Sequence, residues 1–155
     1  ICSLSHSHVS GGKLNDGYDF WNGYYFTTSI TSPTAYRFRN NTSIVSAKDV
    51  IIRNPTGRSG ASPYNECFRG CTNLVYGPTL IQESDNYSLN CARMFSGCSN
   101  LSYVKCLFTD LSKVNLTNWM YGVSETGTFV KYPGVNWPSG ASGIPQGWTV
   151  VEATF

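Results

Sequence analysis

The stretch Phe95-Ser96-Gly97-Cys98-Ser99-Asn100-Leu101 decides how the chain is organised, because a close copy of it occurs earlier. Twenty-seven positions before it the chain reads Phe68-Arg69-Gly70-Cys71-Thr72-Asn73-Leu74, with Phe, Gly, Cys, Asn and Leu identical. Self-similarity at a fixed period of this size is typical of repeat proteins, in which each repeat is one supersecondary unit. The sequence therefore predicts a solenoid.

Two weaker copies flank this pair. Upstream, residues 38–44 keep the Phe, Arg and Thr of residues 68–74 and replace the final Leu by Ile. Apolar pairs follow the first three copies at one common distance: Val50-Ile51, Leu80-Ile81 and Leu107-Phe108. Downstream, Trp119-Met120-Tyr121-Gly122-Val123 lies over Met94-Phe95-Ser96-Gly97-Cys98, with Val in place of Cys. The first three copies agree both in the motif itself and in the apolar pair that follows it, so a chance match does not readily explain them.

Apolar spacing indicates the local structure of each copy. Cys91, Met94, Phe95 and Cys98 fall at i, i+3, i+4 and i+7, which predicts a short helix of about two turns held by packing. Gly70 and Gly97 lie near its expected end, where a left-handed residue is common. After the turn, residues 101–108 alternate apolar and polar side chains, as a half-buried strand does.

The predicted fold is an α/β repeat. We expect a short leucine-rich-repeat-like solenoid, with one short helix and one strand per repeat, closed by a C-terminal β cap. Residues 1–34 are expected to be an irregular segment with a strand at 21–28, continuing from a longer parent chain. The expected repeats span 35–125 and the expected cap spans 126–155. The repeats divide into residues 35–63, 64–90, 91–116 and 117–125 onward.

Eight residues at repeat positions are expected to form the core of the solenoid. They are Phe38, Phe68, Cys71, Leu74, Met94, Phe95, Cys98 and Leu101. Six cysteines are present in all, and we favour buried free thiols, because free Cys behaves as a small apolar residue and Val123 replaces it in the last copy. A disulfide framework and a metal site remain alternatives.

Composition excludes several classes of function. Charged residues make up 13% of the chain, aromatic residues 14%, and the net charge is +2. This balance disfavours disorder, and the scattered Lys and Arg do not form the basic groove of a nucleic-acid-binding protein. No apolar run reaches membrane-spanning length. We therefore expect neither nucleic acid as a partner nor membrane insertion.

Catalytic and metal-binding motifs do not emerge from the sequence. His6 and His8 have no nearby cysteine or carboxylate cluster, so a polar terminal segment is the better interpretation. Asp16 and Asp19 are a close acidic pair with nothing to indicate a cleft around them. A Gly-x-Ser-x-Gly nucleophile elbow is absent from the sequence. We expect a protein that is not an enzyme and has no cofactor or metal.

A functional hint comes from two tyrosines. Tyr76 and Tyr103 occupy equivalent positions on the outward phase of the expected strands, and Lys105 follows close to Tyr103. Tyrosines on a strand face can stack on sugar rings or form a protein-binding patch. Isolated exposed tyrosines are also common without any function. Tyr76, Tyr103 and Lys105 are our candidate ligand-binding residues.

Two sequence patterns resemble those of BspA-like leucine-rich-repeat proteins, particularly those of Bacteroides and its phages. The first is Cys91-x2-Met94-Phe95-x-Gly97-Cys98-Ser99-x-Leu101 followed by Val104-Lys105-Cys106-Leu107. The second is Trp119-x2-Gly122-Val123, Gly127-Thr128-Phe129-Val130-Lys131, Trp137 and Gly143-Ile144-Pro145-x-Gly147-Trp148-Thr149-Val150, which is similar to the C-terminal module of such proteins. The preceding repeat departs from the first pattern, because Tyr64 stands at the position of Cys91 and Cys67 at the position of Met94.

This resemblance implies a solenoid displayed outside the cell, on a cell surface or a phage virion, and used for attachment. Its expected partner is a surface glycan or a protein receptor. The alternative is a structural domain of a phage tail, virion or surface fibre, whose partners are neighbouring subunits. The family implies no catalytic residues.

Overall fold

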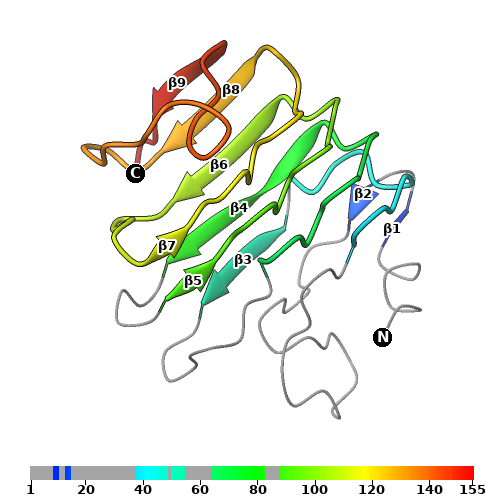
Figure 1. Ribbon diagram of the computed structural model, residues 1–155, viewed down its shortest axis with the longest axis horizontal. Helices are drawn as coiled ribbons and strands as arrows, with labels where there is room; N and C mark the ends of the chain where they lie inside the picture. The colour runs from blue at the N-terminus through cyan, green and yellow to red at the C-terminus, as the bar shows by residue number, and fades with distance from the viewer. Residues whose placement is uncertain (1–8, 11–12, 15–37, 49, 55–63, 83–87) are drawn as a thin grey trace.

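The computed structural model describes residues 9–10, 13–14, 38–48, 50–54, 64–82 and 88–155. The strand expected at 21–28, the pairs His6/His8 and Asp16/Asp19, and Cys2 lie outside these residues. The described part is a β-solenoid of about three turns (Figure 1). The repeat architecture predicted from the sequence is therefore confirmed.

Parallel strands form the main sheet of the solenoid. The order across this sheet is β3 (Ile51–Asn54), β4 (Tyr76–Gln82), β6 (Tyr103–Leu107), β8 (Gly127–Lys131) and β9 (Trp148–Glu152). A separate two-stranded parallel sheet pairs β5 (Leu89–Asn90) with β7 (Val114–Asn115). Near the N-terminus, β1 (Val9–Ser10) pairs antiparallel with β2 (Lys13–Leu14). The core lies between the main sheet and the segments that return to it.

The predicted helix is wrong: the described residues contain no helix, and a double turn stands where a helix was expected in the last three repeats. The double turns are residues 64–71, 91–98 and 116–123. In the second of them, alternate amides donate to carbonyls of the next turn of the solenoid: Cys91 to Asn115 (2.8 Å), Arg93 to Thr117 (3.0 Å), Phe95 to Trp119 (2.8 Å) and Gly97 to Tyr121 (2.8 Å).

The amides between them donate within the double turn, to the carbonyl three residues earlier. These bonds run from Met94 to Cys91 (3.1 Å), from Ser96 to Arg93 (3.2 Å) and from Cys98 to Phe95 (3.0 Å). A helix would direct its amides to carbonyls four residues back and could not tie one turn of the solenoid to the next. The double turn satisfies the same backbone groups and also links the turns.

Left-handed residues shape the double turns. Gly70, Gly97 and Gly122 have φ values of 75°, 78° and 76°, at the place where the sequence suggested a left-handed residue. A second such position, four residues earlier, holds Glu66, Arg93 and Asn118, with φ values of 52°, 53° and 49°. A non-glycine residue in this conformation costs roughly 1–2 kcal/mol, so tertiary packing must hold the second position in place.

A stack of aromatic rings runs through the core along the axis of the solenoid. Its ring centroids are 5.6 Å apart for Phe38–Phe68, 5.7 Å for Phe68–Phe95, 5.9 Å for Phe95–Trp119 and 5.5 Å for Trp119–Trp137. All eight residues expected in the core are at most 1% exposed. The repeated Phe is therefore the element that packs one turn against the next.

A loop between β8 and β9 covers the end of the stack. The ring of Trp137 lies on that of Trp119 at an interplanar angle of 10°, and Trp119 donates through Nε1 to the carbonyl of Gly143 at 2.7 Å. The Ser142 hydroxyl accepts from the Asn118 amide (3.0 Å), and the Ala141 carbonyl accepts from the Met120 amide (3.0 Å). In the earlier turns such amides bond to the next turn of the solenoid. At the last turn the loop accepts their hydrogen bonds instead.

The described cysteines, Cys67, Cys71, Cys91, Cys98 and Cys106, are all buried free thiols, as the sequence indicated. Cys71 donates through Sγ to the carbonyl of Phe38 at 3.0 Å, and Cys98 donates to that of Phe68 at 2.9 Å. These two thiols therefore fill space in the core and also bond to the preceding turn of the solenoid. The described part of the chain is built of strands and turns and holds no helix with the length and apolar character needed to cross a membrane.

Candidate functional site

Tyr76 and Tyr103 lie side by side on the outer face of the main sheet. They are register partners on β4 and β6, with ring centroids 6.2 Å apart and ring planes inclined by 58°. Tyr76 is 41% exposed and Tyr103 is half-buried. The two tyrosines singled out from the sequence therefore form one continuous aromatic surface.

The alternation of β6 places Tyr103 on this face. Val104 and Cys106 are fully buried, so Tyr103 and Lys105, which alternate with them, point away from the core. In β4 the register shifts between Tyr76 and Thr79, which is the mark of a β-bulge. The bulge aligns Leu80 with Cys106, where the sequence comparison aligned it with Leu107.

Gly77 lets the bulge pack closely against β6. A Cβ atom there would lie 3.2 Å from both the carbonyl oxygen of Tyr103 and the side chain of Val104, tighter than ordinary contacts. Glycine at this position therefore keeps the backbone next to Tyr76 against the backbone of Tyr103.

Lys48 completes the tyrosine pair. Its ammonium nitrogen lies 5.3 Å from the centroid of the Tyr76 ring and 4.9 Å from that of Tyr103, within the range of a cation–π interaction. The Ala47 amide donates to the Tyr76 carbonyl at 2.7 Å, which fixes the segment that carries Lys48 beside β4. One ammonium group therefore interacts with both tyrosine rings.

Sequence reasoning did not identify Lys48, and the repeat alignment gives it a misleading position. Lys48 follows Ile44 by four residues, just as Lys105 follows Leu101 by four. The structure separates the two lysines, because two more residues lie between Ser46 and Ile51 than between their register partners Tyr76 and Thr79. Lys105 is aligned with Thr79, one row along the sheet from the tyrosines.

A row of hydroxyl groups crosses the main sheet through the tyrosine pair. It consists of register partners on successive chain segments: Ser46, Tyr76, Tyr103, Thr128 and Thr149. Neighbouring strands in a sheet are about 4.8 Å apart, so the row extends over roughly 19 Å. We call these residues the hydroxyl row. Each can donate and accept hydrogen bonds, which gives the face donors and acceptors in a line.

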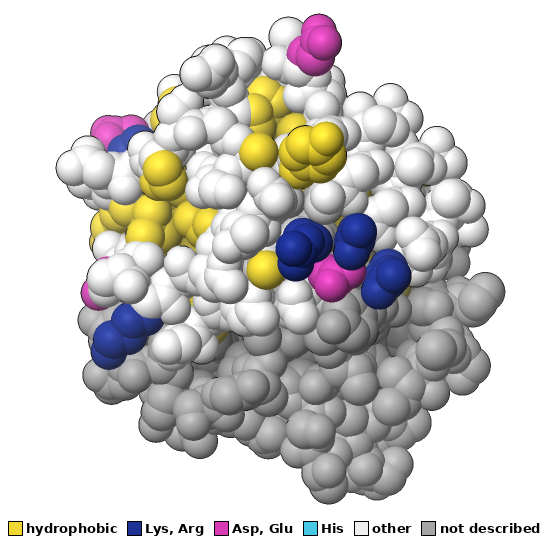
Figure 2. All heavy atoms as spheres, viewed as in Figure 1, with side chains coloured by type: hydrophobic (Ala, Val, Ile, Leu, Met, Phe, Trp, Pro, Cys, Tyr) yellow, Lys and Arg dark blue, Asp and Glu magenta, His cyan; other side chains and the backbone are white. Residues whose placement is uncertain are grey.

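A separate charged cluster lies on the double turns. The Glu66 carboxylate accepts from Arg69 at 2.7 Å and lies 3.5 Å from Arg39, and its side chain is 12% exposed. Figure 2 shows basic side chains gathered around an acidic one on this face. Because both arginines contact the same carboxylate, the cluster is readily explained as stabilisation of a nearly buried charge.

The chemistry of the described cysteines is that of packing residues. Burial raises the pKa of the Cys91 and Cys106 thiols, and a hydrogen bond with Cys71 together with burial raises that of Cys98. These three thiols therefore stay neutral, whereas a nucleophilic cysteine needs a thiolate. Groups of three or more His, Cys, Asp or Glu side chains able to hold a metal ion do not occur among the residues with described positions.

Comparisons with known proteins add no relative. The chain matches no family model, and neither the curated proteins nor the solved structures contain a significant match.

Proposed function

We propose that this chain is a non-enzymatic attachment module whose hydroxyl row binds a surface glycan. The observation that carries the proposal is the pairing of Tyr76 with Tyr103 beneath a shared lysine. Beside the Lys48 ammonium, the two neighbouring tyrosine rings offer apolar surface against which the C–H faces of sugar rings can pack, and their hydroxyl groups can bond to sugar hydroxyls.

The surroundings of the pair suit a polar chain-like ligand. Thr128 and Thr149 continue the row beyond Tyr103, and Ser46 continues it beyond Tyr76. Lys48 and Lys105 add two positive charges and form no ion pair with a described carboxylate. A glycan carrying carboxylate or sulfate groups is therefore favoured over a neutral one.

The sequence patterns support an extracellular setting for this activity. Residues 91–107 and 119–150 resemble BspA-like proteins, whose solenoids are displayed on cell surfaces or phage particles. We propose membership of that group, with a double turn in place of the helix of a leucine-rich repeat. On this proposal the module is part of a surface protein or of a phage tail fibre and serves receptor binding.

A glycan array followed by a binding titration tests the proposal. The variant Tyr76→Ala/Tyr103→Ala should lose binding to the best glycan by more than about tenfold, because each lost aromatic contact is worth about 0.5–1.5 kcal/mol beyond its area. Tyr121→Ala is the control, since Tyr121 is 62% exposed and lies on a double turn instead of the sheet. Unchanged binding of the double variant would eliminate this face.

A second candidate function is contact between subunits of a fibre or virion. The outer edge of β9 has no partner strand among the described residues, and Val150 and Val151 on it are 46% and 43% exposed. An apolar edge strand of this kind is a template for pairing with another chain. Light scattering would show an oligomer that Val151→Lys returns to monomer; a wild-type monomer would exclude this role for the isolated chain.

A further inference from the structure

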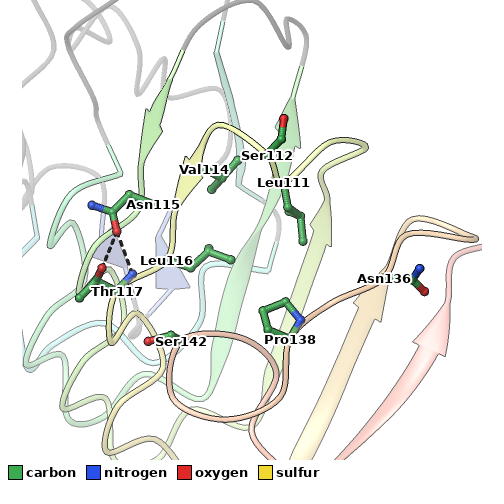
Figure 3. A pocket seen from close by; sticks show the side chains of 9 residues that line it. All are labelled: Leu111, Ser112, Val114, Asn115, Leu116, Thr117, Asn136, Pro138 and Ser142. Atoms are coloured by element: carbon green, nitrogen blue, oxygen red, sulfur yellow. Dashed lines mark hydrogen bonds between the residues drawn. The ribbon is translucent and has the colours of Figure 1, made fainter.

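A groove of about 590 Å³ lies between β7 and the loop that caps the aromatic stack. Figure 3 shows the side chains of Leu111, Leu116 and Pro138 pointing toward one another across it, with Ser112 at one end and Ser142 near the other. Hydrophobic side chains also gather on this part of the surface in Figure 2. The groove is independent of the hydroxyl row.

One edge of β7 is already paired. Leu89 and Asn90 of β5 are the register partners of Val114 and Asn115, and the Cys91 amide donates to the Asn115 carbonyl at 2.8 Å. In a parallel ladder, alternate residues direct their N–H and C=O groups to opposite sides. Asn115 therefore faces β5, and the groups that flank it, the Val114 carbonyl and the Leu116 amide, face the groove.

Neither of these two backbone groups bonds to any residue whose position the structure describes. Their counterparts one turn earlier are the Leu89 carbonyl and the Cys91 amide, which flank Asn90 and face β7. The groove thus exposes one complete rung of a parallel ladder.

The loop that caps the aromatic stack bonds to later amides of the last turn but not to the Val114 carbonyl or the Leu116 amide. Ser142 accepts from the Asn118 amide and Ala141 accepts from the Met120 amide, so the later amides of the last turn are satisfied. Between the loop and β7, however, lies the groove, in the place where the strand of a further turn would pair. The groove therefore presents, along β7, a backbone acceptor and a backbone donor that a further strand could pair with.

We propose that the groove binds an extended peptide segment of another protein, which adds to β7 as a third parallel strand. Strand addition of this kind takes its affinity from backbone hydrogen bonds and its specificity from alternate side chains. The two strands already present show the pattern that fits: Leu89-Asn90-Cys91 and Val114-Asn115-Leu116 are apolar–polar–apolar, with Leu89, Cys91 and Leu116 buried. The bound segment should follow the same pattern.

A peptide that copies residues 112–117, Ser-Lys-Val-Asn-Leu-Thr blocked at both ends, is a suitable probe. We expect saturable binding in a titration followed by amide NMR, with the Leu116 amide among the most strongly shifted signals because it gains a hydrogen bond. In the expected register the peptide's Asn N–H donates to the Val114 carbonyl, and its Asn C=O accepts from the Leu116 amide.

Two methylated peptides of equal composition separate strand pairing from apolar contact. N-methylation of the peptide's Asn removes the donor to Val114 and should weaken binding about tenfold, whereas N-methylation of its Leu, whose N–H points away, should have little effect. Equal binding of both peptides, or no saturable binding at millimolar concentrations, would overturn the proposal. So would protection of the Leu116 amide by self-association of the protein without peptide.

Discussion

Phe68 and Phe95 stack with their rings nearly parallel, the ring centroids 5.7 Å apart and the planes inclined by only 11°. They are equivalent residues on successive turns of the solenoid, and both are fully buried. Phe38 and Trp119 extend the same stack on either side. The period in the sequence therefore has a direct physical counterpart, because each turn rests on the ring contributed by its neighbour.

Removing one ring from the middle of this stack should be costly. Phe95→Ala is expected to lower the free energy of unfolding by about 3–5 kcal/mol, because it leaves a cavity between Phe68 and Trp119. Chemical denaturation measures the effect, with Tyr121→Ala as an exposed aromatic control that should change stability by about 0.5 kcal/mol at most. A loss below about 1 kcal/mol for Phe95→Ala would contradict the assignment.

Both left-handed positions of the double turn should favour glycine, so removing glycine from one and introducing it at the other should change stability in opposite directions. Gly97→Ala should destabilise by roughly 1–2 kcal/mol, because φ is 78° there. No steric clash adds to this, since the new Cβ would lie 3.7 Å from its nearest neighbour, Gly70. Arg93→Gly should stabilise by relieving the strain of φ 53° at Arg93, less the entropy that glycine costs in the unfolded chain.

Thermal unfolding of the two variants beside Ser96→Ala, which lies between them, measures this contrast. A neutral effect of Gly97→Ala would show that the double turn can adopt another conformation. Destabilisation by Arg93→Gly comparable to that of Gly97→Ala would show that the arginine side chain, and not the backbone, decides the stability at that position.

Stability should fall at alkaline pH because of the buried thiols. Burial raises the pKa of Cys91 in the folded chain, whereas an unfolded chain releases this proton near the ordinary thiol pKa of about 8.5. The stabilising contribution is fully present below the unfolded pKa. It declines as the pH rises above that value, by about 1.4 kcal/mol per pH unit for one thiol.

Urea denaturation from about pH 7 to about pH 10 tests this dependence. Cys91→Ala should be less stable at neutral pH but should show a shallower decline above about pH 8.5, because one titrating group has been removed. Identical slopes for the two proteins would mean that Cys91 titrates normally in the folded state. Native and denatured thiol titrations should agree with this result, with the five described thiols reacting only after denaturation.

The two lysines near the tyrosine pair should differ in their effect on an anionic ligand. Lys48→Met is expected to weaken binding more than Lys105→Met, because the Lys48 ammonium lies within 5.3 Å of both ring centroids and Lys105 is aligned with Thr79 in the next row. Methionine keeps the length of the side chain while removing its charge. A larger effect of Lys105→Met would instead indicate that the ligand binds one row along the sheet, beside Lys105 and Thr79.

The sequence predicted the repeat and its buried residues but not the conformation between them. Cys91, Met94, Phe95 and Cys98 are buried as the spacing required, yet they lie on a double turn. A double turn and a helix bring the same residues inward over this length, so apolar spacing alone does not separate them. The deciding feature is where the amides bond, and Arg93, an ordinary helix former, gives no warning of its left-handed φ.

The candidate site was predicted in part for a similar reason. The equivalence of Tyr76 and Tyr103 follows from the period, so their proximity could be read from the sequence. Lys48 could not be placed, because its position depends on extra residues between Ser46 and Ile51 that leave the register of the strands to either side intact. The open rung beside β7 depends on how the capping loop folds back, which local patterns do not reveal.

Whether the tyrosine pair is the glycan-binding face is tested most directly by an amide NMR titration with the best glycan from the array. We expect the largest shifts at Tyr76, Tyr103 and Thr128, which are adjacent on three strands but far apart in the sequence. Smaller shifts should occur near Lys48. Saturable shifts confined to other residues, with the signals of Tyr76 and Tyr103 unmoved, would contradict the proposed function.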